Sequence, residues 1–303
     1  MSVSRPGRVA ARGGPAGAPP FGVWAVQTGP QGPDLEVNLR GSLDVVRVAG
    51  AHDGVVVLPE MFARPFCCVG ASDPSYFDWA EPLDGPTVSG AAALARELRC
   101  VVVAPFFERG TVDGEYYNSA VVLGSDGVPV EGQLSDGSAV RTYRKNAVSA
   151  FRWEKQVNDE KYYFRPGPGY ATFDTERGRL GVLICLDRWF PEAWRSLALQ
   201  GAQVVCVSNA SQGDVDDLFV ASIRTYAAQS VLYAVAVNRA GVEQVGPTSV
   251  RYYGQSCVVD PNGTVLAQAG KRPEVISAHV DLGLVTATRH WRTMFRVVPS
   301  STR

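Results

Sequence analysis

The sequence predicts an α/β protein in which two sheets face each other and helices cover their outer sides. Apolar runs typical of strands alternate with segments whose apolar residues recur at helical spacing. About ten or more strands and about four long helices are expected, which is too much sheet for one doubly wound layer. The chain has 303 residues, of which 46% are hydrophobic, so it can bury a substantial core.

The first part of the chain alternates strands with helices. Residues 21–28 and the apolar runs 55–60 and 101–108 are predicted strands, and the two continuous runs are typical of strands buried on both faces. The spacing of leucine, valine and alanine predicts helices over 34–52 and 85–99.

Shorter elements are predicted in the middle of the chain. Residues 118–130 are interpreted as two strands around a Ser-Asp-Gly turn, because glycine tolerates the positive φ of tight turns. Residues 141–145 form a predicted strand that ends in a lysine. Residues 146–169 are predicted to be a long loop, and residues 170–186 a hairpin.

The last part of the chain returns to longer elements. A helix is predicted over 190–202, with Pro191 in its first turn, where a missing N–H does no harm. A strand over 202–211 and a helix over 217–231 follow. About three or four further strands are predicted up to residue 282, the middle pair being joined by a Pro-Asn-Gly turn.

We expect one domain over residues 21–285, flanked by two tails. Residues 1–20 are rich in Gly, Pro, Ala and Arg, which favours disorder, and they lack the apolar stretch of a signal peptide. Residues 286–303 are basic and aromatic. Two interpretations of this C-terminal tail are open: a loose segment, or one that packs on a partner at a subunit interface.

Composition argues against several classes of function. A net charge of -1 argues against nucleic acid as the main partner, because proteins that bind it usually carry a basic excess. No apolar run reaches the ~18 residues of a membrane span. The six cysteines contain no CxxC pair and the three histidines are scattered, so no metal site is predicted. A reducing cytoplasm is the expected location.

Three residues with ionisable or nucleophilic side chains follow predicted strands. Glu60, Lys145 and Cys185 each stand at the end of an apolar or mixed run, and sites in α/β sheets gather at the carboxyl ends of strands. Taken singly, the glutamate and the lysine fit solvated strand ends, and the cysteine fits a core position. Together they fit a base, a cation that stabilises an oxyanion, and a nucleophile.

The segments around these residues resemble a known family. LPEMF, YRKN and ICLDRWFPE are similar to the signature segments of the nitrilase (carbon–nitrogen hydrolase) superfamily, closest to members acting on N-carbamoyl amino acids or carbamoylputrescine. NDEKYYFRPG, SNAS, AVNRAG and VVDPNGTVL extend the resemblance over about residues 20–285. It implies a four-layer α-β-β-α sandwich, a Glu-Lys-Cys triad, no cofactor, and a homodimer or larger homo-oligomer.

The resemblance assigns roles to particular residues. It implies Glu60 as the base, Lys145 as the triad lysine and Cys185 as the nucleophile. A second glutamate that helps to hold the site is matched by Glu160, with Glu154 as the alternative. Family members commonly have a bulkier insertion or a histidine-containing run after the lysine, which this chain lacks.

These residue types suit the hydrolysis of an amide. A thiol with its ordinary pKa of about 8.5 is mostly protonated at neutral pH, so Cys185 needs a base, and Glu60 can take its proton. Lys145 and the backbone N–H of Leu186 are the expected oxyanion donors. Glu60 then protonates the departing ammonia and activates the water that hydrolyses the thioester.

Arg188 is the main candidate for substrate specificity. Relatives that act on N-carbamoyl amino acids carry arginine at this position and bind a carboxylate, whereas carbamoylputrescine amidases, whose substrate ends in an amine, carry glutamine. A planar guanidinium suits a carboxylate. The alternative is a structural ion pair with Asp187, Glu192 or another acid. Further candidates for substrate contact are Phe66, Trp189 and Asn209.

The favoured function is hydrolysis of an N-carbamoyl amino acid by a cysteine amidohydrolase. One alternative is an amidase or nitrilase acting on another small carboxamide or nitrile. A second is an amide-forming acyltransferase that uses the same triad. A non-catalytic module with the same fold and an unrelated α/β binding protein are further alternatives, disfavoured by the intact triad and by the order of the segments.

Overall fold

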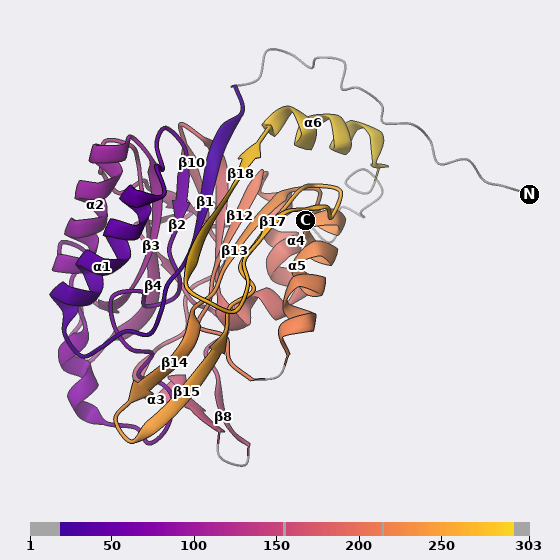
Figure 1. Ribbon diagram of the computed structural model, residues 1–303. Coiled ribbons are helices and arrows are strands. Elements are labelled where there is room, and N and C mark those ends of the chain that lie inside the picture. The colour runs from indigo at the N-terminus through magenta and orange to yellow at the C-terminus, as the bar shows by residue number, and fades with distance from the viewer. Residues whose placement is uncertain (1–18, 154–155, 214, 294–303) are drawn as a thin grey trace, which may run out of the picture.

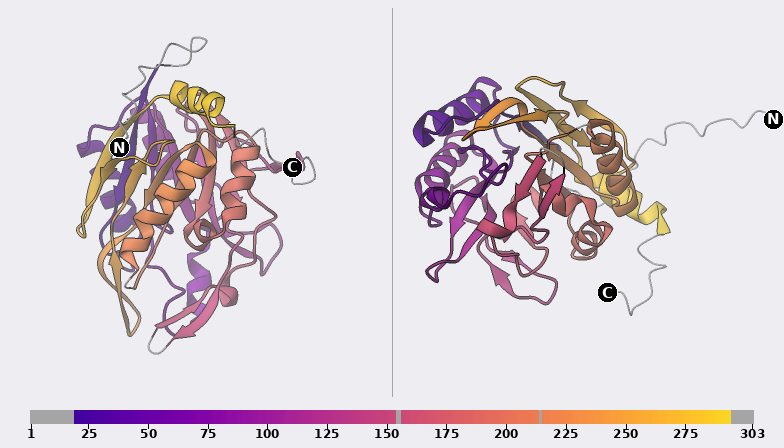
Figure 2. Two further views of the ribbon diagram at one scale, coloured as in Figure 1. Left: turned by 90° about the vertical axis from the view of Figure 1, so that its right-hand side faces the viewer. Right: turned by 90° about the horizontal axis from the view of Figure 1, so that it is seen from below.

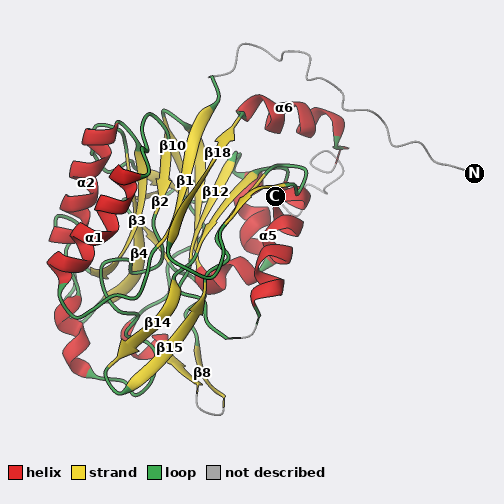
Figure 3. Ribbon diagram, in the orientation of Figure 1, coloured by secondary structure: helices red, strands yellow, loops and turns green. Residues whose placement is uncertain are grey.

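The computed structural model describes residues 19–153, 156–213 and 215–293, and it confirms the four-layer α-β-β-α sandwich. Two sheets stack face to face, and a pair of helices covers the outer side of each (Figure 1, Figure 3). The covering helices are α1 (Leu35–Val48) and α2 (Pro86–Leu98) on one side, and α4 (Pro191–Leu199) and α5 (Asp216–Ser230) on the other.

In the described part of the chain, six strands form the first sheet and eight form the second. In spatial order, the first sheet contains β18 (Glu274–Val280), β1 (Phe21–Gln27), β2 (Val55–Val57), β3 (Val101–Arg109), β4 (Tyr116–Leu123) and β7 (Tyr143–Arg144). The second contains β17 (Val265–Gln268), β16 (Cys257–Val259), β13 (Tyr233–Val237), β12 (Val204–Ser208), β11 (Gly178–Ile184), β10 (Thr172–Thr175), β5 (Gly132–Gln133) and β6 (Ala139–Val140). Strands β1 to β3 and β11 to β13 run parallel.

Successive residues of the central strands point into different layers. In β2, Val55 and Val57 pack between the two sheets, whereas Val56 packs against α1 and α2. The residues of β12 alternate in the same way between the inter-sheet core and the layer under α4 and α5. Both faces of these strands are therefore buried, which explains why their sequences are continuously apolar.

The four long predicted helices all form. Asp34 caps α1 by accepting a hydrogen bond from the Val37 amide at 3.0 Å. Pro86 and Pro191 open α2 and α4, where proline removes only an N–H that would lack an intrahelical partner. Across the described segments, no helix is both long and apolar enough to cross a bilayer.

Two of the local predictions are wrong. Residues 146–169 are not a plain loop, because they contain a hairpin of β8 (Ala150–Trp153) and β9 (Gln156–Asp159) and the short helix α3 (Glu160–Tyr163). The hairpin pairs with itself outside the main sheets, so its sequence lacks the apolar signal of a buried strand. Residues 118–130 supply one strand, β4, and after it only an isolated bridge between Leu123 and Pro129.

The helix α6 (Leu282–Trp291) crosses residue 285, where the sequence suggested that the domain ends. It lies across the end of the sandwich opposite the hairpins β8–β9 and β14 (Ala240–Val245)–β15 (Thr248–Tyr253) (Figure 1, Figure 2). Val285 is buried in the inter-sheet core, and Arg289 donates to the carbonyls of Val231 and Ala202. Residues 1–18 and 294–303 lie outside the described residues.

We predict that Val285→Ala lowers the free energy of unfolding by about 2 kcal/mol, because it removes two buried methyl groups and leaves a cavity. Val48→Ala is the matched control, since Val48 is also helical but 89% exposed, and its effect should stay within about 0.5 kcal/mol. Urea unfolding of the wild type and both variants measures these changes in the free energy of unfolding. Equal effects would mean that α6 is not part of the domain core.

Candidate active site

Three predicted site residues follow the ends of strands at one edge of the sandwich. Glu60 follows β2, Lys145 follows β7 and Cys185 follows β11. The two sheets are joined at this edge by a hydrogen bond from the Ser208 hydroxyl to the Leu58 carbonyl, at 2.8 Å. The layered fold therefore brings together residues that are far apart in the sequence.

Lys145 lies between two carboxylates. Its Nζ is 2.9 Å from Oε1 of Glu60 and 2.5 Å from Oε1 of Glu160, and all three side chains are at most 1% exposed. Burial disfavours the ammonium, but the charges of Glu160, Glu60 and Cys185 outweigh this and raise the pKa of Lys145 well above its ordinary value. The neighbouring carboxylates therefore favour the charged form of Lys145.

Further donors fix the orientation of both carboxylates. Glu60 accepts hydrogen bonds from Nδ2 of Asn118 at 2.7 Å and from the amide of Ala210 at 2.9 Å. The second oxygen of Glu160 accepts from the Ser149 amide at 3.0 Å. Glu154 lies outside the described residues, and the position beside Lys145 is taken by Glu160.

Cys185 begins a tight turn, the 3₁₀ helix η2 (Cys185–Trp189). Its φ of 48° lies in the left-handed region, which is uncommon and costly for a residue with a side chain. Its Sγ lies 3.6 Å from the Ser211 hydroxyl oxygen. Burial and the negative charge of Glu60 raise the pKa of the thiol to about 12, although Lys145 opposes this. At neutral pH the resting thiol is protonated and needs a base.

Asp187 ties the turn that begins at Cys185 to the segment that carries Lys145. This buried carboxylate accepts hydrogen bonds from the Tyr143 hydroxyl at 2.6 Å and from the amides of Ala147 and Ile184 at 2.7 and 3.1 Å. Tyr143 belongs to β7, directly before the lysine. The carboxylate thereby holds the two turns together, a role that its sequence position did not reveal.

Cys185 opens into a small cavity of about 130 Å³. Its lining includes Glu160 and, among the residues predicted to contact substrate, Phe66, Leu186, Arg188 and Trp189. Asn209 does not line it, because this side chain is fully buried and donates to the carbonyls of Val207 and Val237. The remaining lining residues are Ser149, Phe151, Asn158, Ala210, Ser211, Gln212, Val215 and Tyr253.

Arg188 is a buried cation with neutral neighbours. It is 2% exposed, and its Nη2 lies 3.2 Å from the Tyr253 hydroxyl and 3.5 Å from the Ser211 hydroxyl. Its guanidinium carbon lies 4.7 Å from the centre of the Trp189 ring. Among the described residues, Nε and Nη1 have no hydrogen-bond partner and no carboxylate forms an ion pair with Arg188. The alternative ion pairs with Asp187 and Glu192 do not form.

Several residues of the site were not predicted from the sequence. Asn118 on Glu60, Ser149 on Glu160 and Tyr253 on Arg188 are examples. Tyr253 ends β15, about 65 positions from the arginine it contacts, and no local pattern marks such a pair. The five other cysteines are buried.

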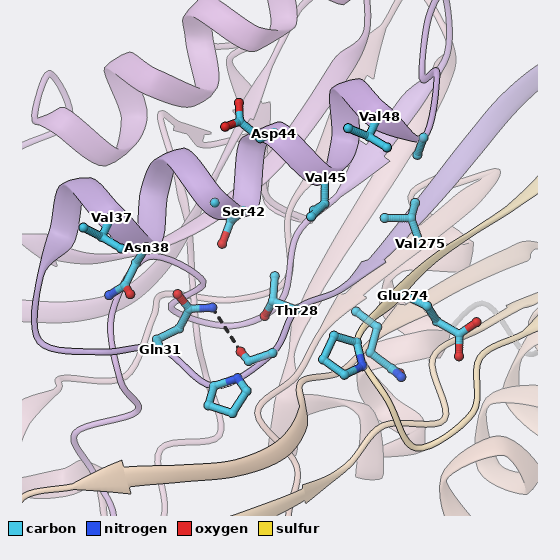
Figure 4. Close-up of a pocket in the computed structure, with 16 residues that line it drawn as sticks. Thr28, Gln31, Val37, Asn38, Ser42, Asp44, Val45, Val48, Glu274 and Val275 are labelled. Carbon is cyan, nitrogen blue, oxygen red and sulfur yellow. Dashed lines mark hydrogen bonds between the residues drawn. The ribbon is translucent and has the colours of Figure 1, made fainter.

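A larger cavity of about 650 Å³ lies away from this edge, between α1 and the strands β1 and β18 (Figure 4). Val37, Val45 and Val48 of α1 line it opposite Val275. None of the predicted site residues lines it. Across the described ranges, no group of three or more His, Cys, Asp or Glu side chains is arranged to hold a metal ion.

Comparison with known proteins agrees with this architecture. The fold matches a carbon-nitrogen hydrolase from Helicobacter pylori G27 with a TM-score of 0.82 and 26% identity, over 93% of this chain and 96% of that one. The chain is 31% identical over 280 residues to an N-carbamoylputrescine amidase from Solanum lycopersicum, covering 87% of each protein. It is 30% identical over 276 residues to a citrullinase from Francisella tularensis, covering 87% and 90%.

The family model described as carbon-nitrogen hydrolase matches residues 23–290, and the chain belongs to this family. The sequence-based prediction of the family is confirmed, and so is the prediction that the protein is an amidohydrolase.

The raised thiol pKa gives a direct prediction for titration. The thiolate absorbance of the wild-type protein minus that of Cys185→Ser should show no step near the ordinary thiol pKa of about 8.5, since the folded protein keeps this proton until the pH approaches about 12. The thiolate absorbance is recorded as the pH is raised. A difference step at or below about pH 8 would show that Lys145 dominates and that the resting nucleophile is a thiolate.

Proposed function

We propose that this protein hydrolyses N-carbamoyl amino acids, with Cys185 as nucleophile, Glu60 as general base and acid, Lys145 as oxyanion partner and Glu160 as the residue that holds Lys145. The observation that carries the proposal is the buried guanidinium of Arg188, which lines the same small cavity as the thiol. Its open nitrogens are the feature that a substrate carboxylate would satisfy.

The surroundings of Arg188 favour an anionic substrate group. A buried charge without a counter-ion is costly, and the described neighbours of the guanidinium are hydroxyl groups and aromatic rings rather than carboxylates. A guanidinium presents parallel N–H donors that match the two oxygens of a carboxylate. An amine-terminated substrate would place a second cation beside the first, so it would be rejected.

The dimensions of the cavity favour a short substrate. Sγ of Cys185 and Nη2 of Arg188 lie 3.6 and 3.5 Å from the same Ser211 oxygen. Sγ and Nη2 therefore lie within about 7 Å of each other. A substrate whose carbonyl carbon is held ~3–3.5 Å from Sγ has room only for a short linker between that carbon and a carboxylate on Arg188. A volume of about 130 Å³ admits a small linear molecule.

The chemistry follows from the four charged or nucleophilic side chains. Glu60 takes the thiol proton as Sγ attacks the carbamoyl carbon, and the negative charge on the oxygen is stabilised by Lys145 and the Leu186 amide. The C–N bond breaks, and ammonia leaves with the proton from Glu60. Water, activated by Glu60, then cleaves the S-acyl bond, and the resulting carbamic acid decomposes to the amino acid and carbon dioxide.

The names of two relatives support a carbamoyl or ureide substrate. One is named N-carbamoylputrescine amidase and another citrullinase. The arginine at position 188 separates this chain from the glutamine pattern of the carbamoylputrescine enzymes, which is why we favour a substrate with a carboxylate.

Cys185→Ala should abolish ammonia release while leaving the fold intact, because the variant lacks the attacking atom. The test compares both proteins on N-carbamoyl-α- and β-amino acids, N-carbamoyl amines, simple amides and nitriles, with circular dichroism as the control for folding. Turnover that persists in the variant would contradict the proposed mechanism. Amide products formed with added amines would instead identify an acyltransferase.

Arg188→Gln tests the carboxylate assignment separately. We expect kcat/KM for N-carbamoyl amino acids to fall by about 10²-fold or more, since a charge-assisted bidentate contact is lost. Turnover of an N-alkylurea of equal length, which has no carboxylate, should change by no more than a few-fold. Equal losses on both substrates would assign Arg188 a structural role.

Two further expectations stay predictions. We propose that the protein acts as a homodimer or larger homo-oligomer in the cytoplasm. Light scattering coupled to size-exclusion chromatography measures the oligomeric state. A single monomeric mass at working concentration would contradict the proposed oligomer.

A further inference from the structure

We infer that Arg239, together with its ion-pair partner Glu243, is a positioning residue for Glu60. The inference rests on the proposed function, in which Glu60 is the general base. Arg239 stands between β13 and β14 in the segment AVNRAG, for which the mechanism above has no use. Its guanidinium is fully buried and points at the turn that carries the base.

Most of the hydrogen bonds that Arg239 donates go to that turn. Nη2 donates to the carbonyls of Met61, Arg64 and Glu60 at 2.5, 2.6 and 2.9 Å. Nε donates a second bond to the Glu60 carbonyl, at 3.2 Å. One side chain thereby fixes three backbone carbonyls within five consecutive residues of the chain, starting with the base itself.

The turn needs such support because its backbone is strained. Met61, directly after the base, has a φ of 49°, in the left-handed region that residues with side chains rarely adopt. This conformation directs the Glu60 carboxylate toward Lys145, Asn118 and the Ala210 amide. A relaxed turn would move the carboxylate away from these partners, and Arg239 opposes that relaxation by holding the carbonyls on either side of the strained residue.

Glu243 balances the charge and extends the support to the cavity wall. Its Oε2 accepts from Nη1 of Arg239 at 2.6 Å, and its Oε1 accepts from the Phe66 amide at 3.0 Å and from the Tyr252 hydroxyl at 3.1 Å. Phe66 lines the cavity beside Cys185. The buried pair therefore joins the base and one wall of the substrate site to the end of β13.

Lysine cannot replace this arginine geometrically. An ammonium has one nitrogen, whereas Arg239 uses three nitrogens that point to different acceptors in a fixed plane. Arg239→Lys keeps the buried positive charge and changes only the fork, so it separates positioning from charge. Arg289→Lys is the matched control, because Arg289 also donates to two backbone carbonyls, those of Val231 and Ala202 at the opposite ends of the strands.

The experiment measures ammonia release and the rate of Cys185 alkylation by iodoacetamide in the full-length wild-type protein, Arg239→Lys, Arg289→Lys and Glu60→Gln. For Arg239→Lys we expect kcat to fall by about 10²-fold with KM changed less than threefold, because a misplaced general base slows chemistry rather than binding. Alkylation at neutral pH should slow in parallel, since the thiol depends on Glu60 for deprotonation. Arg289→Lys should leave both rates within about twofold of wild type.

Wild-type kcat in Arg239→Lys, or an equal loss in Arg289→Lys, would overturn the inference. A loss confined to KM would overturn it as well. Should Arg239→Lys fail to fold, Glu243→Gln, which removes the partner charge and turns one acceptor oxygen into a donor, replaces it, because it keeps the size and shape of the side chain, and the same kcat loss is expected. Full activity in Glu60→Gln would instead contradict the proposed function, which keeps the two failures distinct.

Discussion

The structure depends on one buried ammonium held between two carboxylates. Lys145 is 1% exposed and bonds to both Glu60 and Glu160, so three ionisable side chains meet inside the protein. Such charges are tolerated only when each is paired and its remaining hydrogen-bonding capacity is used. Asn118 and the amides of Ser149 and Ala210 donate the hydrogen bonds that the carboxylates of Glu60 and Glu160 require.

The same arrangement accounts for two strained residues at this edge. Met61 and Cys185, two of the described non-glycine residues with positive φ, lie directly after Glu60 and directly after β11. Each strained turn is held by a buried ionic side chain, Arg239 in the first case and Asp187 in the second. The stability of the packed scaffold therefore offsets the strain of the two turns that position Glu60 and Cys185. Strained backbone of this kind is common at active sites.

The sequence predicted the layers, and the closeness of Glu60 and Lys145, because both depend on local signals. Continuous valine runs indicate strands buried on both faces, and Glu60, Lys145 and Cys185 each follow the end of a strand. The supporting residues were less accessible to sequence analysis. Arg239 and Asp187 act across about 179 and 44 positions of sequence, and their partners are mostly backbone atoms, which leave no trace in residue type. The hairpin β8–β9 was missed for a related reason, since its pairing is independent of the apolar core.

The central claim is that Lys145 pairs with two buried carboxylates, and urea unfolding of Lys145→Met beside Lys145→Met/Glu160→Gln tests it most directly. The single variant leaves two buried carboxyl groups side by side with no cation between them, and we predict a loss of about 3–5 kcal/mol in the free energy of unfolding. The double variant leaves one ionisable carboxyl group there and should recover more than half of that loss, while remaining inactive. Equal stability of the single variant and the wild type, or of the two variants, would contradict the account.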